Sequence, residues 1–198
     1  MEAAEPDQAV RDHLQRGDWA AAATAGLRAH GPELLRYLRR VLANETIAQD
    51  AFSDFCERLW KAIPRFRGDA SFRTWAYRLA WSAAAECLSD PARRRQQRLD
   101  TPQFHAVAEA IRTSTAEHLR TPARDRLEEA RRSLSPEDRS LLILKIEEGL
   151  SWQQVAEVMG REGHPVNELA LRKRFSRLRG RLRALMNPEK GGVPTPRR

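Results

Sequence analysis

The sequence is poor in the residues and runs that mark secreted, metal-binding or membrane-spanning proteins. Its two cysteines, Cys56 and Cys87, lack motif spacing and suit a reducing cytosol. The five histidines are scattered, so no cluster has metal-ligand spacing, and we expect neither a metal nor a cofactor. The longest uncharged run, residues 19–27, is far too short to span a bilayer. Since the N-terminus also lacks the pattern of a signal peptide, we expect a cytoplasmic protein without membrane contact.

β-Branched residues are also few, and no stretch alternates with the period of two that a half-buried strand requires. The chain is therefore predicted to be all-α, with two helical domains joined by a flexible linker and a helix-turn-helix in the C-terminal one. Pro32 after Gly31 is typical of a first helical position, and Ser135 before Pro136 is typical of a cap. The expected helices span residues 7–16, 18–29, 32–43, 45–62, 71–88, 103–119, 122–133, 136–148, 152–160 and 168–186.

Composition divides the chain into two blocks and two polar segments. Residues 1–88 are predicted to form an aromatic-rich N-terminal domain, and residues 122–186 a domain that ends in a basic helix. Residues 89–121 are proline-broken and are interpreted as a linker, whereas residues 187–198 are expected to be disordered. One weak helix in the linker would carry four apolar side chains on one side, namely Phe104, Val107, Ala108 and Ile111.

Positive charge is concentrated near the C-terminal end. Residues 161–198 hold 11 Lys and Arg against 3 Glu, an excess equal to the +8 of the whole chain. Such a local excess favours a nucleic acid partner over general solubility, with a membrane surface as the weaker alternative. The last helix carries one apolar stripe, formed by Leu171, Phe175, Leu178, Leu182 and Leu185. Arginines and one lysine occupy the positions between them.

The segment before this basic helix has its own start and stop signals. A short helix beginning after Ser151 would end near Gly160, with Val155, Ala156 and Met159 facing inward. A short helix, a turn and a long basic helix are the elements of a helix-turn-helix, whose second helix enters a major groove. The predicted base-reading residues are Arg172, Lys173 and Ser176, and the predicted phosphate contacts are Arg174, Arg177, Arg179 and Arg183. The competing interpretation is a solvated basic helix in an ordinary bundle.

Two further surfaces are open to more than one interpretation. The helix at 45–62 has an apolar inner stripe and an acidic, polar outer surface, which consists of Glu45, Gln49, Asp50, Asp54 and Glu57. From the residues alone, this surface is either a solvated face or a docking surface for a basic partner. In the next helix, Trp81 lies opposite the core face that contains Phe72. Core packing and base stacking are equally compatible with that position.

Four segments of the chain, in this order, resemble the bacterial extracytoplasmic-function (ECF) sigma factors. The similarity begins within residues 16–42 and is strongest at residues 48–80, AQDAFSDFCERLWKAIPRFRGDASFRTWAYRLA. It resumes at residues 134–160, LSPEDRSLLILKIEEGLSWQQVAEVMG, and in the basic last helix. Together these segments cover roughly two thirds of the chain, and the FRGD string with the aromatic residues after it is the specific part. The family usually has Asn where Ser82 stands and often Asp where Glu86 stands.

The resemblance implies a protein without catalytic residues that binds core RNA polymerase and directs it to promoter DNA. It implies that the helix at 45–62 docks on the clamp of the large polymerase subunit, through or near Glu45, Gln49, Asp50, Phe52 and Asp54. It implies that the following loop and helix melt the −10 element, with Phe66, Arg67, Asp69, Arg73, Tyr77, Arg78, Trp81, Ser82 and Glu86. The last domain would read the −35 element and contact the polymerase flap. An anti-sigma factor is a further candidate partner.

Two other classes of protein compete with this hypothesis. A stand-alone helix-turn-helix regulator would need a dimer surface or an effector pocket, and the sequence indicates neither. An enzyme acting on nucleic acid would need clustered carboxylates for metal ions or a glycine-rich phosphate loop. The acids here are interleaved with arginines on predicted helix exteriors instead. The sigma factor is therefore the preferred hypothesis, and the stand-alone regulator is the alternative.

Overall fold

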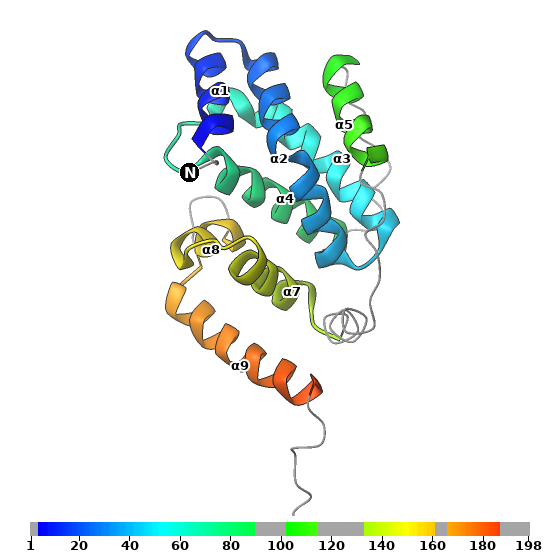
Figure 1. Ribbon diagram of the computed structural model, residues 1–198, viewed down its shortest axis with the longest axis vertical. Coiled ribbons are helices and arrows are strands. Elements are labelled where there is room, and N and C mark those ends of the chain that lie inside the picture. The colour runs from blue at the N-terminus through cyan, green and yellow to red at the C-terminus, as the bar shows by residue number, and fades with distance from the viewer. Residues whose placement is uncertain (1–3, 90–101, 115–132, 161–165, 187–198) are drawn as a thin grey trace, which may run out of the picture.

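The computed structural model describes residues 4–89, 102–114, 133–160 and 166–186 (Figure 1). All regular elements in these ranges are helical, which confirms the predicted all-α class. The α-helices are α1 (Ala4–Gln15), α2 (Trp19–Leu42), α3 (Glu45–Ala62), α4 (Phe72–Ser89), α5 (Pro102–Ser114), α7 (Pro136–Leu142), α8 (Trp152–Met159) and α9 (Glu168–Met186). A 3-10 turn, η1 (Ile63–Arg65), follows α3, and a π-helical turn, η3 (Ile143–Glu147), follows α7. The helix expected over 122–133 lies outside the described residues.

The predicted helix boundary at Gly31 and Pro32 is wrong, because α2 runs through both residues. A proline inside a helix removes one backbone hydrogen bond and crowds the preceding turn, at a cost of about 3 kcal/mol. The helix continues because twelve of its residues, on both sides of Pro32, are buried, and burial of that face outweighs one lost bond. Gly31 does not break the helix. It allows α2 and Ile111 to pack closely, since a Cβ there would lie 2.5 Å from Ile111 Cδ1.

Helices α1 to α5 surround one apolar core. Tyr37 of α2 and Tyr77 of α4 are fully buried in it, with their rings in an edge-on contact at a centroid distance of 5.2 Å. The apolar side predicted for the weak linker helix is confirmed in α5, where Phe104, Ala108 and Ile111 are buried. Because α5 packs on α2 and α3, this part of the predicted linker contributes to the core of the N-terminal block.

Helices α7 and α8 begin at the residues that the sequence predicted, Ser135 and Ser151. Ser135 Oγ accepts a hydrogen bond from the Asp138 N–H at 3.2 Å, and Ser151 forms a reciprocal capping box with Gln154. Asn167 Oδ1 accepts from the backbone of the first turn of α9. The helix predicted over 136–148 differs in detail, since α7 is continued by the π-helical turn η3.

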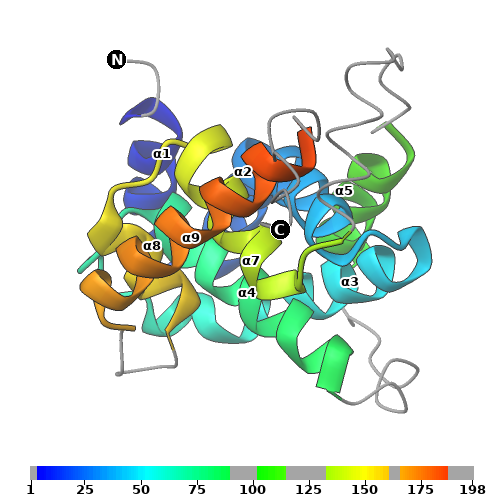
Figure 2. The ribbon, with the colours of Figure 1, turned by 90° about the horizontal axis from the view of Figure 1, so that it is seen from below.

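The C-terminal segment packs against the N-terminal block (Figures 1 and 2). Helix α7 contacts α2 and α8 contacts α4, while α9 lies on the outer side of α7 and α8. Leu141, Leu144 and Val155 belong to the same continuous core as the N-terminal helices. A second, small cluster joins α9 to α7 and comprises Leu134, Leu142, Leu178 and Leu182. None of the described helices is both long and apolar enough to cross a membrane.

Candidate nucleic-acid and partner interfaces

Helix α9 has one buried side and one cationic side. Leu171, Leu178 and Leu182 are buried and Phe175 is half-buried, which confirms the predicted stripe for the side chains that the structure describes. The opposite side is exposed and carries six of the predicted DNA contacts, namely Arg172, Lys173, Ser176, Arg177, Arg179 and Arg183. Figure 2 shows α9 running across the outside of the molecule, so this basic face is open to a polyanion.

Two of the predicted DNA contacts have partners within the protein. Arg174 is half-buried, and its Nε donates to Asp138 Oδ1 of α7 at 2.6 Å. Arg172 lies 3.5 Å from the Glu168 carboxylate, and its guanidinium carbon lies 5.4 Å from the centre of the Trp152 ring. Exposed ion pairs of this kind contribute about 0–1 kcal/mol, so Arg172 can exchange Glu168 for a DNA partner at little cost. Arg174 is fixed more firmly and helps to seat α9 on α7.

Helix α8 fixes the orientation of α9. The Trp152 ring at its start packs edge-on against Phe175 at a centroid distance of 5.4 Å. Val155, Ala156 and Val158 are buried, whereas Met159, which was predicted to face inward, is only half-buried. A short capped helix that holds a longer basic helix at its outer side is the arrangement of a helix-turn-helix.

The outer side of α3 carries most of the predicted polymerase-binding residues. Glu45 is exposed, and its carboxylate accepts hydrogen bonds from Arg39 at 2.7 Å and from Gln49 at 2.8 Å. Burial alone would raise the pKa of Glu45, but these hydrogen bonds and the Arg39 charge lower it below its usual value. Asp50 is half-buried, and Phe52 is fully buried. Phe52 therefore supports this side of α3 from beneath.

One residue of the predicted acidic surface is buried. Glu57 was expected to face outward, but it is 7% exposed, and its carboxylate pairs with Lys61 one turn later. The prediction failed because α3 is packed by α2, α4, α5 and η1, so its buried surface is wider than one stripe. The acidic surface of α3 is consequently smaller than the sequence indicates.

The loop before α4 and the first turns of that helix hold several predicted −10 residues. Phe66 is half-buried and packs against Trp75, with ring centroids 4.9 Å apart. Arg67 and Asp69 are exposed on either side of Gly68, whose φ of +77° favours glycine. An open pocket lies beside this loop and is lined by Asp69, Ala70, Thr74, Trp75, Arg78 and Glu157.

Further along α4, the predicted −10 residues contact other parts of the protein. Tyr77 and Trp81 are buried in the core, Trp81 at 8% exposure. Burial, together with the nearby Glu33 and Glu148, raises the pKa of Tyr77 above its usual value. Core packing therefore describes Trp81 in this structure, and stacking on a base would require its ring to become accessible.

A single arginine of α3 connects the residues predicted for two different surfaces. Arg58 Nη1 donates to Ser82 Oγ at 2.9 Å, and Nη2 lies 2.7 Å from Asp54 Oδ2 and pairs with Glu86. Burial alone would lower the pKa of Arg58, but the two carboxylates raise it. Ser82 and Glu86 of α4 are thus fixed to the side of α3 that is predicted to bind polymerase.

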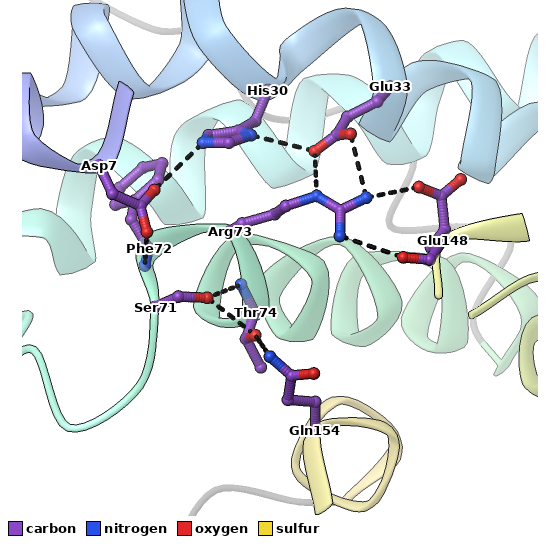
Figure 3. A network of polar contacts seen from close by, with 9 residues as sticks. All are labelled: Asp7, His30, Glu33, Ser71, Phe72, Arg73, Thr74, Glu148 and Gln154. Carbon is purple, nitrogen blue, oxygen red and sulfur yellow. Dashed lines mark hydrogen bonds and ion pairs between the residues drawn. The ribbon is translucent and has the colours of Figure 1, made fainter. Parts of the chain in front are cut away.

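A network of polar contacts links α1, α2, α4 and the segment before α8 (Figure 3). Arg73 Nε donates to Glu33 Oε1 at 3.0 Å, and Arg73 Nη2 donates to Glu148 Oε2 at 2.6 Å. His30 lies between two carboxylates, with Nδ1 3.0 Å from Glu33 and Nε2 3.3 Å from Asp7. Burial alone would lower the pKa of His30, but its hydrogen bonds to Asp7 and Glu33 raise it above 6.5.

Sequence reasoning missed Arg58 as a connecting residue, and it assigned Arg73 to DNA and not to a contact within the protein. Arg58 had a local signal, because Asp54 lies four residues earlier on the same helix face. The partners of Arg73 had none, since they lie 40 and 75 residues away along the chain. Only the packing of α2, α4 and η3 brings them together.

The family model and the relatives that match this chain all belong to the RNA polymerase sigma factors. A family model described as Sigma-70 region 2 matches residues 27–98. The RNA polymerase sigma-H factor of Pseudomonas aeruginosa is 30% identical over 167 residues, which cover 78% of this chain and 83% of that protein. The ECF RNA polymerase sigma-E factor of Haemophilus influenzae is 29% identical and covers similar shares, 77% and 83%. The ECF RNA polymerase sigma factor SigG of Mycobacterium tuberculosis is 28% identical over 81% of this chain and 48% of that protein.

The described helices define an all-α protein with an exposed basic helix near its C-terminal end. Together with the relatives, they show that the chain belongs to the RNA polymerase sigma factors, within the ECF group. Its function is that of a sigma factor, which interacts with core RNA polymerase and promoter DNA and directs the initiation of transcription. The stand-alone regulator is not favoured, because the match includes the N-terminal block.

Proposed function

We propose that three parts of the chain divide the work of promoter recognition. Helix α9 reads the −35 element in a major groove, residues 66–86 hold the opened strand of the −10 element, and α3 docks on the clamp of the large polymerase subunit. The observation that carries this proposal is the exposed cationic face of α9, which α8 fixes on the outside of the molecule. A solvated helix would have no need of so many cations on one side.

Within α9, base reading falls to the first turns and phosphate binding to the rest. Arg172, Lys173 and Ser176 are exposed where the recognition helix of a helix-turn-helix meets base edges. Arg177, Arg179 and Arg183 continue the exposed face towards the C-terminal end, where phosphate contacts fix the register without reading sequence.

The contacts with polymerase are proposed on the resemblance, with the polar side of α3 as support. Glu45, Asp50 and Asp54 all lie on this side, where Glu45 and Asp54 are paired with Arg39 and Arg58. A basic partner would compete with these arginines for the two carboxylates. Contact of the last domain with the polymerase flap, and an anti-sigma factor as a further partner, complete the proposal.

Transcription in vitro tests the function directly. Purified core polymerase, this protein and sheared DNA from its source would be combined, and transcript 5′ ends would be mapped. Discrete starts that share two upstream elements, and that are absent without the protein, support the proposal. The absence of such starts, together with no co-elution with core polymerase, would refute it.

Charge reversal then assigns the two activities to separate helices. The variant R172E/K173E should abolish promoter-specific starts and still co-elute with core polymerase, because both residues lie on α9. The variant D50K should lose co-elution instead. The matched control is R16E/R28E, which reverses two exposed cations on the N-terminal block and should behave as the wild type. Loss of core binding in R172E/K173E would contradict this division.

A further inference from the structure

The carboxylate of Asp7 in α1 contacts the first residue of α4 (Figure 3). Asp7 Oδ2 accepts a hydrogen bond from the Phe72 backbone N–H at 3.2 Å, although the two residues lie 65 positions apart along the chain. Asp7 Oδ1 lies 3.3 Å from His30 Nε2 of α2. Asp7 therefore joins α1, α2 and the start of α4.

Both partners of this contact are buried. The Asp7 and His30 side chains are only 11% and 7% exposed. A buried carboxylate is costly unless it is paired and hydrogen-bonded. His30 provides the pairing, because its Nδ1 also faces the Glu33 carboxylate at 3.0 Å, and only a doubly protonated imidazolium can donate to both carboxylates. A buried cation on α2 thus holds Asp7 in its contact with Phe72.

Helix α4 does not need Asp7 in order to begin. Ser71 Oγ accepts a hydrogen bond from the Thr74 N–H at 3.1 Å, which is the contact of an ordinary N-cap. The additional bond to Asp7 comes from a different helix, so it determines where the start of α4 lies relative to α1 and α2. The dipole of α4 also favours a negative charge at this end of the helix.

The loop before α4 is anchored at the same place. The Phe72 ring lies so near α2 that a Cβ at Gly26 would be 2.2 Å from it. Phe66, at the other end of the loop, packs edge-on against Phe72 with ring centroids 5.7 Å apart. The exposed Arg67 and Asp69 lie between these two aromatic residues. A displacement of Phe72 would therefore shift both anchors of a loop that carries two predicted −10 residues.

We infer that Asp7 is a positioning residue for the opened −10 strand, because it fixes the start of α4 and with it the loop of residues 67–71. The inference rests on the proposed function of residues 66–86, and it adds α1 to the parts of the chain that support strand opening. Asp7 itself is 8% exposed and does not meet DNA, so its effect passes through Phe72. The duplex contacts of α9 should not depend on Asp7, since they involve neither α1 nor α4.

Binding of holoenzyme to two DNA probes tests the inference. Both probes carry the upstream element of a promoter that the transcription assay has mapped. The first ends as duplex before the −10 element, and the second continues through it with one strand unpaired, each strand being tried in turn. The variant D7A should bind the second probe about tenfold more weakly than the wild type, the effect of one lost hydrogen bond to a charged group, and the first probe equally. D7N keeps an oxygen that can accept from the Phe72 N–H and should restore most of the binding.

Asp12 provides the matched control. It lies on the same helix as Asp7, and its carboxylate accepts a hydrogen bond from Gln8 within α1. The variant D12A therefore removes an equal charge and should bind both probes as the wild type does. The variant H30Q leaves Asp7 in place but removes the cation that holds it. H30Q should bind the second probe about threefold more weakly, and it covers the case in which D7A does not fold.

Hydrogen exchange on the free full-length chain tests the position of the start of α4 without DNA. The amides of residues 72–75 should exchange faster in D7A than in the wild type, while those of α3 keep the wild-type rate. D7N and D12A should exchange as the wild type does at both places. Faster exchange throughout the chain in D7A would indicate a general loss of stability and would contradict a local role for Asp7.

The outcomes distinguish the inference from the proposed function. Wild-type binding of the second probe by D7A, or by H30Q where D7A does not fold, overturns the inference even if promoter-specific transcription is observed. An equal loss on both probes also overturns it. Absence of promoter-specific starts with the wild type overturns the proposed function, and the role of Asp7 in strand opening with it. Faster exchange of residues 72–75 in D7A would then leave Asp7 as a residue that only fixes α4.

Discussion

Removal of two cations from α9 gives a quantitative test of the proposed −35 surface. Arg179 and Arg183 are exposed, and no ion pair involves them within the described residues. If each neutralises one phosphate, each contributes about 0.9 to the slope of log Kobs against log salt concentration. The variant R179Q/R183Q should therefore reduce the magnitude of this negative slope by about 1.8. Its loss of affinity between about 50 and 200 mM salt should be smaller than that of the wild type by a factor of roughly 12.

The assay is fluorescence anisotropy of a labelled promoter duplex, titrated with holoenzyme at several salt concentrations. The control variant, R16Q/R28Q, removes one exposed cation from the turn after α1 and one from α2, and it should keep the wild-type slope. Equal slopes for R179Q/R183Q and the control would show that these side chains do not contact phosphates, and would refute the proposed orientation of α9. A slope of smaller magnitude in both variants would show that the DNA also contacts the N-terminal block.

Three further predictions concern stability. The pKa of His30 is raised in the folded protein. Its contribution to the free energy of unfolding should therefore be complete below an unfolded pKa of about 6.5 and be lost as pH rises through the folded pKa. The variant H30Q should make the denaturation midpoint less dependent on pH between pH 6 and 9. Arg139 is 8% exposed, and its Nε and Nη1 have no hydrogen-bond partner in the described structure. Burial lowers the pKa of Arg139 despite the nearby Glu137. The variant R139M should raise the Tm by several degrees in calorimetry, and a lower Tm would contradict the assignment of Arg139 as a destabilising buried charge. A Cβ at Gly26 would lie 2.2 Å from the Phe72 ring. In denaturant titrations, G26A should lower the free energy of unfolding by about 1–3 kcal/mol. G180A, where a Cβ meets open space, should not lower it.

Local patterns predicted the parts of the fold that depend on local interactions. Ser135 and Ser151 were expected at the starts of their helices, and each accepts a backbone hydrogen bond there. The stripe of α9 was readable because a 3.6-residue period fixes which side chains share a face. The exposure of the opposite cations follows from the same geometry.

The predictions that failed depended on neighbours that no local pattern reveals. Gly31 and Pro32 have the composition of a break, but the burial of α2 on both sides of them keeps the helix intact. Glu57 has the composition of an exposed residue, yet the helices around α3 bury it. In both cases tertiary packing decides against a local preference that is worth only a few kcal/mol.

The candidate site illustrates a different limit of sequence reasoning. The resemblance assigned Arg73, Ser82 and Glu86 to DNA, which is their expected role in a complex with promoter. In the free chain, Arg73 is held by Glu33 and Glu148, and Arg58 contacts both Ser82 and Glu86. Arg73 and Glu86 are half-buried, so these two side chains need polar partners in either state. If they contact DNA, binding must exchange one set of partners for another, and its net free energy is the difference between the two sets. The contacts that Arg73, Ser82 and Glu86 make within the protein therefore set how favourable their DNA contacts must be.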